Sequence, residues 1–268
     1  MMHHLVFDFD GTITVKDTIG ELAASAVAWQ QQQRLGSSLQ GAWDEAVRAY
    51  CADLATVSEP TTVEDEARFL ASARAVEEAS LERVRLTGIF AGLEATELSR
   101  MGTSAVTDGR ISLRAGFGAV TELAARHGWR TDVISAHWSG AFIGGVLFGA
   151  GVGVGGVTAN EVVADEGRIE GGVTTSGDKL AVLKRIVATG EVVVYFGDSM
   201  TDFACLVKGA DYGVAMVSES ESRLVKTLRR LGYEVPHVGD MVGRGARVGW
   251  ARSFDDVVES RLLLQTDT

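Results

Sequence analysis

Short apolar runs alternate with longer segments of helical periodicity along most of the chain. The first run, Leu5-Val6-Phe7, leads into polar residues and a glycine, and Val192 to Phe196 is a second run of this kind. Such runs next to glycine predict buried strands that end in turns. Residues 129–135, 154–159 and 212–215 predict further strands. Because helical segments separate them, we predict a parallel sheet built of right-handed strand–helix–strand units.

Between the first strand and about residue 110 the pattern predicts helices and no strand. Ile19, Leu22, Ala23, Ala26 and Val27 repeat at helical spacing directly after Asp17-Thr18, which offers a helix N-cap. Further helices are expected at 39–55, 61–87 and 90–100, with Pro60 at the start of the second. We therefore predict an α/β fold with a Rossmann-like core formed by residues 1–16 and 111–268. Residues 17–110 form an inserted helical cap over the carboxyl edge of the sheet.

After residue 110 helices and strands alternate. A helix through Phe117, Val120 and Leu123 is expected to end at Gly128. A small hairpin is expected over 162–174, with its turn at 165–167. The remaining helices are predicted at 179–188, 202–208, 220–231 and 254–264.

Residues Trp138 to Asn160 contain no charged side chain, and a segment of this length is nominally able to span a bilayer. Glycine is dense in it, and it lacks the aromatic and basic flanks of membrane interfaces. We favour a short buried helix around 141–147 followed by a turn and a strand, with a membrane span as the alternative.

Composition restricts the function classes. The chain has 268 residues, 46% hydrophobic and 23% charged, which is ordinary for a packed soluble protein. The formal net charge is −11, so the chain as a whole lacks the excess positive charge with which proteins bind nucleic acid. Cys51 and Cys205 are too few for a disulfide framework, so we expect free buried thiols in a reducing, cytoplasmic compartment. A strand by Leu5 leaves no room for a signal peptide. The oligomeric state is not predicted.

Polar residues stand where predicted strands end. Asp8 and Asp10 follow the first strand, Ser135 ends another, and Asp198 follows the apolar run at 192–196. Because the carboxyl ends of adjacent parallel strands converge, these side chains are expected to meet in one crevice, within reach of Lys179 at a helix start. Each also has a structural interpretation: a capped turn for the aspartates, a strand-end hydroxyl for Ser135 and a surface position for Lys179.

Such a cluster is suited to phosphoryl transfer. Carboxylates crowded together repel one another, and a divalent cation such as Mg²⁺ with oxygen ligands relieves that repulsion. One carboxylate can attack phosphorus to form an acyl phosphate, and a second can protonate the leaving group and later activate water. The serine hydroxyl, the lysine ammonium and the loop amides can hold the phosphoryl oxygens.

These motifs resemble the haloacid dehalogenase superfamily of phosphohydrolases over nearly the whole chain. The stretch Asp8-Phe9-Asp10-Gly11-Thr12 is similar to the first motif of that family, DxDGT. Ser135 is similar to the second motif, Lys179 to the third, and Gly197-Asp198 with Asp202 to the fourth, GDxxxD. The insert after the first motif resembles the type-1 helical cap.

The resemblance implies a role for each residue. Asp8 is the nucleophile and a Mg²⁺ ligand, and Asp10 is the general acid/base, whose backbone carbonyl also contacts the metal. Asp198 is the remaining carboxylate ligand, with Asp202 binding the metal directly or supporting the ligands. Lys179 also steadies Asp8. The implied substrate-binding residues are Thr12, Asp17, Ser135, Ala136 and Lys179.

Within the superfamily the chain looks most like the phosphoserine phosphatase branch. Asp17 stands where that branch often has a glutamate that contacts the substrate amine, although a plain N-cap is the alternative. Asn160, with Gly167 and Gly171 after it, also resembles the branch. Thr201 replaces a usual asparagine, and Asp17 is one methylene shorter than glutamate, so both depart from the pattern expected for phosphoserine.

The sequence therefore predicts a Mg²⁺-dependent phosphatase that hydrolyses a small phosphomonoester through an aspartyl-phosphate. The partner is a small-molecule phosphate ester, with neither nucleic acid nor membrane. Two alternatives stay open: a phosphotransferase or phosphomutase with the same site, and a binding protein with a vestigial site. The pattern identifies neither the ester nor the cap residues that select it.

Overall fold

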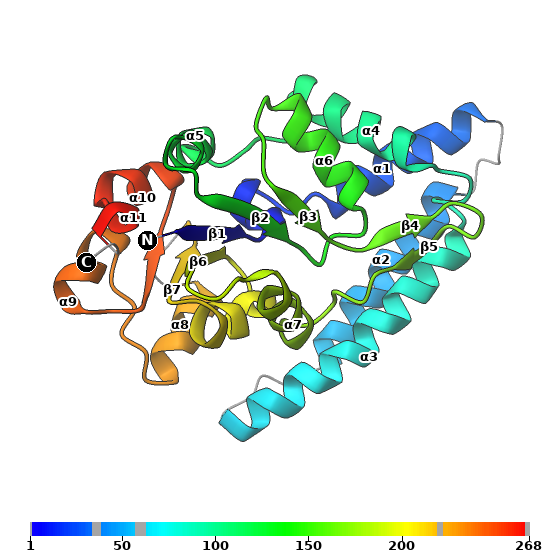
Figure 1. Cartoon of the computed structure of the whole chain (residues 1–268). Coiled ribbons are helices and arrows are strands. Elements are labelled where there is room, and N and C mark those ends of the chain that lie inside the picture. Colours follow the sequence, from blue (N-terminus) through cyan, green and yellow to red (C-terminus); the bar gives the residue numbers. More distant parts are fainter. Residues whose placement is uncertain (1, 34–38, 57–62, 219–221, 266–268) are drawn as a thin grey trace.

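A computed structural model describes residues 2–33, 39–56, 63–218 and 222–265, and its core is a six-stranded parallel sheet (Figure 1). The strand order is β3-β2-β1-β6-β7-β8. The strands are β1 (His3–Phe7), β2 (Arg130–Ile134), β3 (Gly156–Thr158), β6 (Val192–Gly197), β7 (Tyr212–Met216) and β8 (Val248–Ala251). The predicted parallel α/β fold is confirmed.

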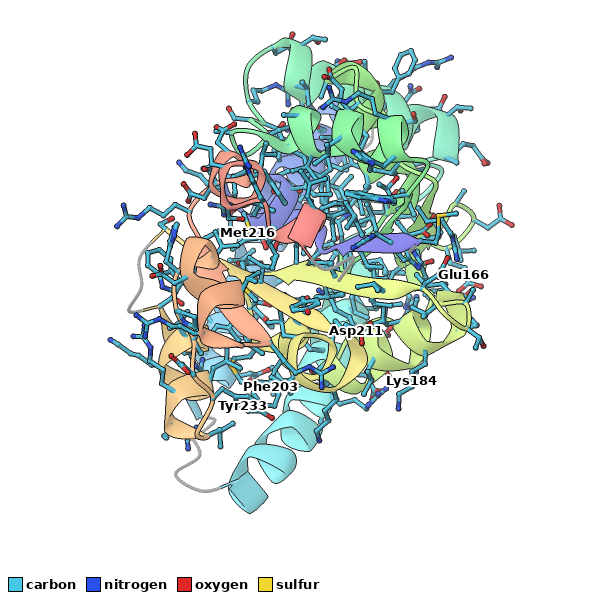
Figure 2. The ribbon with its side chains drawn as sticks, turned by 60° about the vertical axis from the view of Figure 1, so that its left-hand side comes forward. Glu166, Lys184, Phe203, Asp211, Met216 and Tyr233 are labelled. Atoms are coloured by element: carbon cyan, nitrogen blue, oxygen red, sulfur yellow. The ribbon has the colours of Figure 1, made fainter. Side chains whose placement is uncertain are left out.

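Alternation along β1 divides the interior into two layers. Leu5 and Phe7 face one hydrophobic cluster, whereas Val6 between them faces the other, as successive residues of a strand do. Phe7 stacks on Phe196 at a ring-centroid distance of 4.9 Å and meets Phe117 edge-on at 5.2 Å. Side chains fill both layers between the sheet and its helices (Figure 2). This packing holds the end of β1, where the predicted site begins, in a rigid setting.

Helices cover both faces of the sheet. One layer contains α5 (Phe117–His127), α10 (Phe254–Ser260) and α11 (Leu262–Gln265), and the other contains α7 (Ser176–Ile186) and α8 (Arg223–Arg230). Helix α6 (Gly140–Gly149) precedes β3, and α9 (Met241–Arg244) precedes β8. A two-stranded antiparallel hairpin, β4 (Glu161–Val163) with β5 (Arg168–Glu170), follows β3. As predicted, α5 ends at Gly128, which adopts the left-handed conformation.

Within the described residues between β1 and α5 there are four α-helices: α1 (Ile19–Gln32), α2 (Leu39–Thr56), α3 (Val63–Thr87) and α4 (Ala95–Thr107). Helices α2 and α3 pair side by side beyond the end toward which β1 points (Figure 1). The predicted helices are present, although the last runs from residue 95 to 107 rather than from 90 to 100. Pro60 lies outside the described residues.

Helix α4 crosses α6 at close range because glycines line the contact. A Cβ at Gly145 would overlap the carbonyl oxygen of Ser99, and one at Gly102 would overlap that of Phe142. The apolar, glycine-rich segment from 138 to 160 therefore forms a core helix, a turn and strand β3, as predicted. Within the described ranges, no helix is both long enough and apolar enough to cross a membrane.

Gly145→Ala is expected to lower the free energy of unfolding by about 1–3 kcal/mol, because the added methyl group forces apart two packed backbones. Urea denaturation measures the change. Gly144→Ala on the same helix is the control, since a Cβ there meets no atom within 4 Å and alanine favours the helix. Equal stability of both variants would contradict this account of the α4–α6 contact.

Two expectations are corrected by the structure. Cys205 is buried as predicted, but Cys51 is exposed, because it borders an open cavity on α2 instead of packing in the core. Strand β8 and helix α9 are absent from the predicted elements. The four residues of β8, Val-Gly-Trp-Ala, lie between Arg247 and Arg252, and pairing with β7 supplies the backbone hydrogen bonds of the strand. The predicted helix at 202–208 consists of two short turns, at 200–202 and 205–209.

Candidate active site

The loop after β1 is shaped by close contact with the loop after β6. The backbone N–H of Asp8 donates to the Phe196 carbonyl at 2.8 Å, which continues the pairing of the two strands past Phe7. Gly11 has φ +69°, and a Cβ at this position would overlap the Asp198 carboxylate. Glycine is needed here both for the turn and for the approach of Asp198.

A buried lysine lies between two carboxylates. Lys179 Nζ is 2.8 Å from Asp8 Oδ1 and 2.7 Å from Asp202 Oδ1. A capping box between Thr175 and Asp178 fixes the first turn of α7 and so the position of Lys179. Burial alone would lower the pKa of Lys179, but the carboxylates of Asp202 and Asp8 raise it above its ordinary value. The side chain is therefore a fixed cation inside the protein.

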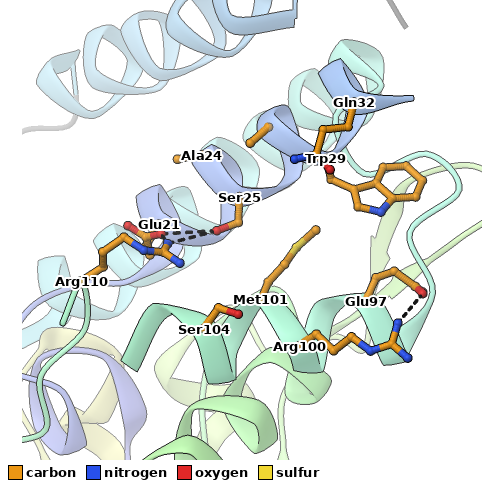
Figure 3. Close-up of a pocket in the computed structure, with 11 residues that line it drawn as sticks. Glu21, Ala24, Ser25, Trp29, Gln32, Glu97, Arg100, Met101, Ser104 and Arg110 are labelled. Carbon is orange, nitrogen blue, oxygen red and sulfur yellow. Dashed lines mark hydrogen bonds and ion pairs between the residues drawn. The ribbon is translucent and has the colours of Figure 1, made fainter. Parts of the chain in front are cut away.

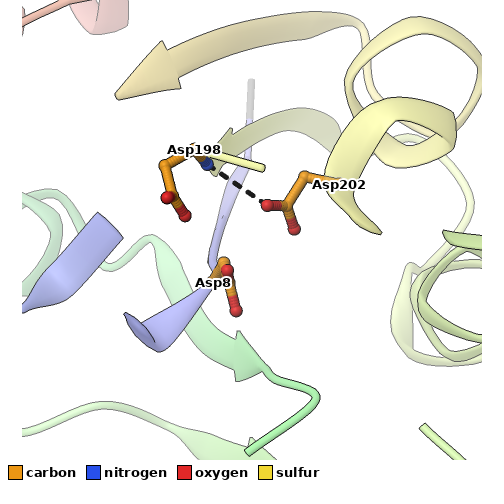
Figure 4. Close-up of side chains that lie close together, drawn as sticks. All are labelled: Asp8, Asp198 and Asp202. Carbon is orange, nitrogen blue, oxygen red and sulfur yellow. Dashed lines mark hydrogen bonds between the residues drawn. The ribbon is translucent and has the colours of Figure 1, made fainter. Parts of the chain in front are cut away.

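Both oxygens of Asp202 are occupied by hydrogen-bond donors. Oδ1 accepts from Lys179 Nζ and from the Tyr195 hydroxyl at 2.8 Å. Oδ2 accepts from the backbone N–H of Asp198 at 3.2 Å (Figure 4). It also accepts from the backbone N–H and the hydroxyl of Ser199, at 3.1 and 3.2 Å. Asp202 thus holds the loop after β6 in place and neutralises Lys179.

Asp8, Asp198 and Asp202 form a compact acidic cluster, with one carboxylate oxygen of each within 4.8 Å of the others (Figure 4). Burial, followed by the charge of Asp202, raises the pKa of Asp8 well above its usual range and that of Asp198 to about 7. Within the described residues, no hydrogen bond reaches Oδ2 of Asp8 or Oδ2 of Asp198. These crowded carboxylates with free oxygens have the donor chemistry that Mg²⁺ requires.

Asp10 links the catalytic loop to helix α1. Its Oδ1 accepts hydrogen bonds from the Thr18 backbone N–H at 2.8 Å and from the Thr18 hydroxyl at 2.6 Å. Thr18 is the N-cap of α1, so the Asp10 carboxylate is oriented by the start of the helical insert. The other oxygen of Asp10 has no hydrogen-bond partner among the described residues.

Thr12 and Arg114 form hydrogen bonds that hold the loop after β1 in place. Thr12 is fully buried and its hydroxyl donates to Asp198 Oδ1 at 3.1 Å, so it orients that carboxylate and does not line the cavity. The Arg114 guanidinium donates to the carbonyls of Gly11 and Thr12, the latter at 3.0 Å. Burial lowers the pKa of Arg114, although Asp198 opposes the shift.

The loop after β2 brings Ser135 to the same edge. Ser135 is almost fully buried, and its Oγ accepts a hydrogen bond from the His137 backbone N–H at 3.1 Å. Asn160 ties this loop to the hairpin, because its side-chain amide donates to the carbonyls of Ala136 and Val173 and its Oδ1 accepts from the Val173 N–H. Asn160 is therefore a structural residue of the site.

A cavity of about 640 Å³ lies over these side chains. Its core side is formed by Asp8, Asp10, Ser135, Ala136, Lys179 and Asp198, and Asp17 also lines it. The insert contributes residues from α2 and α3, namely Trp43, Ala46, Val47, Tyr50, Cys51, Glu77, Ser80 and Val84. The strand-end residues predicted to converge are therefore brought together under the helical insert.

A second cavity, of about 590 Å³, lies between α1 and α4 (Figure 3). Its charged residues pair with each other: Arg110 with Glu21, and Arg100 with Glu97 at 3.4 Å. It contains no group comparable to the Lys179 cluster among its lining residues. The candidate active site is therefore the cavity over Asp8.

Several residues of the site are not predicted by the sequence pattern. Tyr195 donates to the Asp202 carboxylate, and Arg114 donates to backbone carbonyls of the loop after β1. Trp43, Tyr50 and Glu77 line the cavity from the insert. Tyr195 is hidden within an apolar run. The spacing Trp43–Tyr50, two helical turns, is a usable sign that both lie on one face of α2.

Comparisons with known proteins place the chain in a family and show related folds. Residues 5–207 match the family described as haloacid dehalogenase-like hydrolase. A CTO1 family protein of Schizosaccharomyces pombe is 32% identical over 227 residues, which cover 75% of this chain and 77% of that protein. A phosphoserine phosphatase in its apo form superimposes with a TM-score of 0.57 at 16% identity, covering 97% of this chain and 98% of that one. Cytosolic 5′-nucleotidase IIIB bound to cytidine gives 0.57 at 17% identity, covering 99% and 85%.

Proposed function

Since the chain belongs to the haloacid dehalogenase-like hydrolases, we propose that it is a Mg²⁺-dependent phosphatase that hydrolyses a small phosphomonoester through an aspartyl-phosphate. The observation that carries the proposal is the Asp8–Lys179–Asp202 cluster beside Asp10 and Asp198, at the floor of one cavity. Residues 17–110 act as the cap that covers this cavity and selects the substrate.

Each residue has a role that follows from its contacts. The Asp8 carboxylate attacks phosphorus, while Lys179, held as a cation by two carboxylates, binds a phosphoryl oxygen and steadies Asp8. The Ser135 hydroxyl and the backbone near Ala136 bind further phosphoryl oxygens. Asp10, oriented by Thr18, protonates the leaving oxygen and then takes a proton from the water that cleaves the acyl phosphate.

Asp8 and Asp198, with the backbone carbonyl of Asp10, would hold Mg²⁺. The metal would neutralise the crowded carboxylates and the phosphoryl charge. We propose that Asp202 supports these ligands, because Lys179, Tyr195 and three donors of the next loop already occupy both of its oxygens. Thr12 acts in the same way, through its hydrogen bond to Asp198.

The proposal is tested with p-nitrophenyl phosphate. We expect phosphate release in the presence of Mg²⁺, loss of activity in EDTA, and recovery when excess Mg²⁺ is restored. Formation of a phosphorylated acceptor in place of free phosphate would favour a phosphotransferase. Absence of hydrolysis of any phosphomonoester with Mg²⁺ would favour a vestigial site.

Mg²⁺ is also expected to stabilise the fold directly. At a concentration of 100 times Kd, a ligand that binds only the folded chain adds about 2.7 kcal/mol to the free energy of unfolding. Thermal unfolding with and without Mg²⁺ measures the effect without any substrate. Asp198→Asn is expected to remove most of the shift, and an unchanged shift in that variant would contradict its assignment as a ligand.

A further inference from the structure

Two carboxylates of the cavity have no cationic partner. Asp17 and Glu77 both line it, and neither forms an ion pair with any residue that the structure describes. Burial raises the pKa of Glu77, although its hydrogen bond from the Tyr50 hydroxyl at 2.9 Å opposes the shift. Partial desolvation, and then the charge of Asp10, raise the pKa of Asp17, whereas the hydrogen bond from the Ile19 N–H at 2.9 Å and the charge of His137 oppose the shift. A partly desolvated carboxylate without a counter-charge is unfavourable, and a cation on a ligand would correct that.

The two acidic groups act on the same part of the cavity. Tyr50, which donates to Glu77, has its pKa raised by burial, by Glu77 and also by the charge of Asp17. Among the lining residues described, Lys179 is the one Lys or Arg side chain, and Asp8 and Asp202 already neutralise it. Beyond the phosphoryl site, the cavity therefore offers the carboxylates of Asp17 and Glu77 and the imidazole of His137, and no lysine or arginine side chain among those described lines it there to pair with a carboxylate on the substrate.

Aromatic side chains form the wall beside these carboxylates. Trp43 and Trp138 are both half-buried, and their rings meet edge-on at a centroid distance of 6.0 Å. The faces of tryptophan rings attract cations. Ser80, one turn beyond Glu77 on α3, is 6% exposed, and its side chain has no hydrogen-bond partner among the described residues. Its hydroxyl is available to a ligand in the cavity.

From this juxtaposition we infer that the cap side of the cavity binds a cation, and that the substrate is the phosphate ester of an amino alcohol or a quaternary ammonium alcohol. Glu77, oriented by Tyr50, supplies the countercharge, and Trp43 and Trp138 supply the aromatic wall. This inference rests on the proposed phosphatase function. It also implies that a carboxylate on the alcohol part, as in phosphoserine, is disfavoured.

The test compares substrates that differ only in charge. Phosphocholine and 3,3-dimethylbutyl phosphate have the same shape, but the second replaces the cationic nitrogen by carbon. We expect kcat/KM to be about tenfold or more higher for phosphocholine, since a desolvated cation beside aromatic rings and a carboxylate contributes this much. Phosphoethanolamine is likewise expected to exceed O-phosphoserine by about tenfold.

Glu77→Gln should lower the phosphocholine to 3,3-dimethylbutyl phosphate ratio by about fivefold or more, chiefly through KM for the charged ester. The matched control is Glu78→Gln, the next residue of α3, which is exposed and contacts Arg74 at 3.9 Å. Its ratio should equal that of the wild type. Trp43→Leu is a second variant, which tests the aromatic wall. If either variant fails to fold, the phosphocholine to 3,3-dimethylbutyl phosphate ratio of the wild type still tests the cation subsite.

The outcomes separate the two proposals. A wild-type ratio near one, a preference for O-phosphoserine, or a preference for a nucleoside monophosphate over phosphocholine would overturn the cation subsite. If p-nitrophenyl phosphate is hydrolysed in those cases, the phosphatase function still stands. If no ester is hydrolysed, both proposals fail.

Discussion

Asp8→Asn is expected to lower kcat for p-nitrophenyl phosphate by at least about a thousandfold, because the amide cannot form the acyl phosphate on which turnover depends. The position of the side chain should not change, since asparagine has the same shape and the Asp8 backbone N–H remains bonded to Phe196. Substrate hydrolysis under saturating Mg²⁺ measures the loss.

The same substitution should leave the fold intact. Burial and the charge of Asp202 raise the pKa of Asp8. Ionisation of Asp8 therefore opposes folding once the pH exceeds the ordinary pKa of an aspartate, and asparagine removes this destabilising contribution. Lys179 loses one partner but retains Asp202 at 2.7 Å. We therefore expect thermal unfolding of the metal-free variant within a few degrees of the wild type, which excludes misfolding as the cause of inactivity.

Asp240→Asn is the control for this experiment. Asp240 is an exposed aspartate far along the chain from the site, before α9, and its substitution should change neither kcat nor stability appreciably. If Asp8→Asn retained appreciable turnover, its role as the nucleophile would be wrong, whatever the result for the control.

The strand ends were predictable because parallel strands follow simple rules. The apolar runs at Leu5–Phe7 and 192–196 predict two strands of the parallel sheet, and the polar residue after each run has to lie at the same edge of the sheet. Hydrophobic periodicity is therefore enough to place Asp8 and Asp198 at one edge, whereas the pairing of β1 with β6 is shown by the structure. The order of the strands and the crossing of α4 over α6 depend on contacts distant in sequence, which periodicity does not encode.

The supporting side chains could not be predicted for a different reason. Tyr195 lies within the apolar strand β6, where the pattern assigns it to the core, yet its hydroxyl reaches Asp202. Glu77 belongs to α3, a helix rich in alanine and glutamate, and the sequence does not distinguish it from the other glutamates of this helix. Which of its glutamates faces the cavity follows only from how α2 packs against α3, as shown by the hydrogen bond from Tyr50.

Lys179→Met is expected to lower the free energy of unfolding by about 3–5 kcal/mol, because it leaves two buried carboxylates facing each other without a cation. Methionine has nearly the same length and no charge, so a cavity contributes little to the loss. Urea denaturation at neutral pH without metal measures the change. Activity is expected to disappear as well, since the phosphoryl group loses its cationic contact.

Lys184→Met on the same helix is the matched control, because Lys184 is exposed near the end of α7 (Figure 2) and its substitution should change stability little. In a second comparison, Lys179→Met is made in the background of Asp8→Asn. The charge of Asp8 is then absent, and the loss in free energy of unfolding caused by Lys179→Met should be smaller by about 1 kcal/mol or more. An equal cost in both backgrounds would show that Lys179 stabilises the fold through packing, and would contradict the electrostatic account of the cluster.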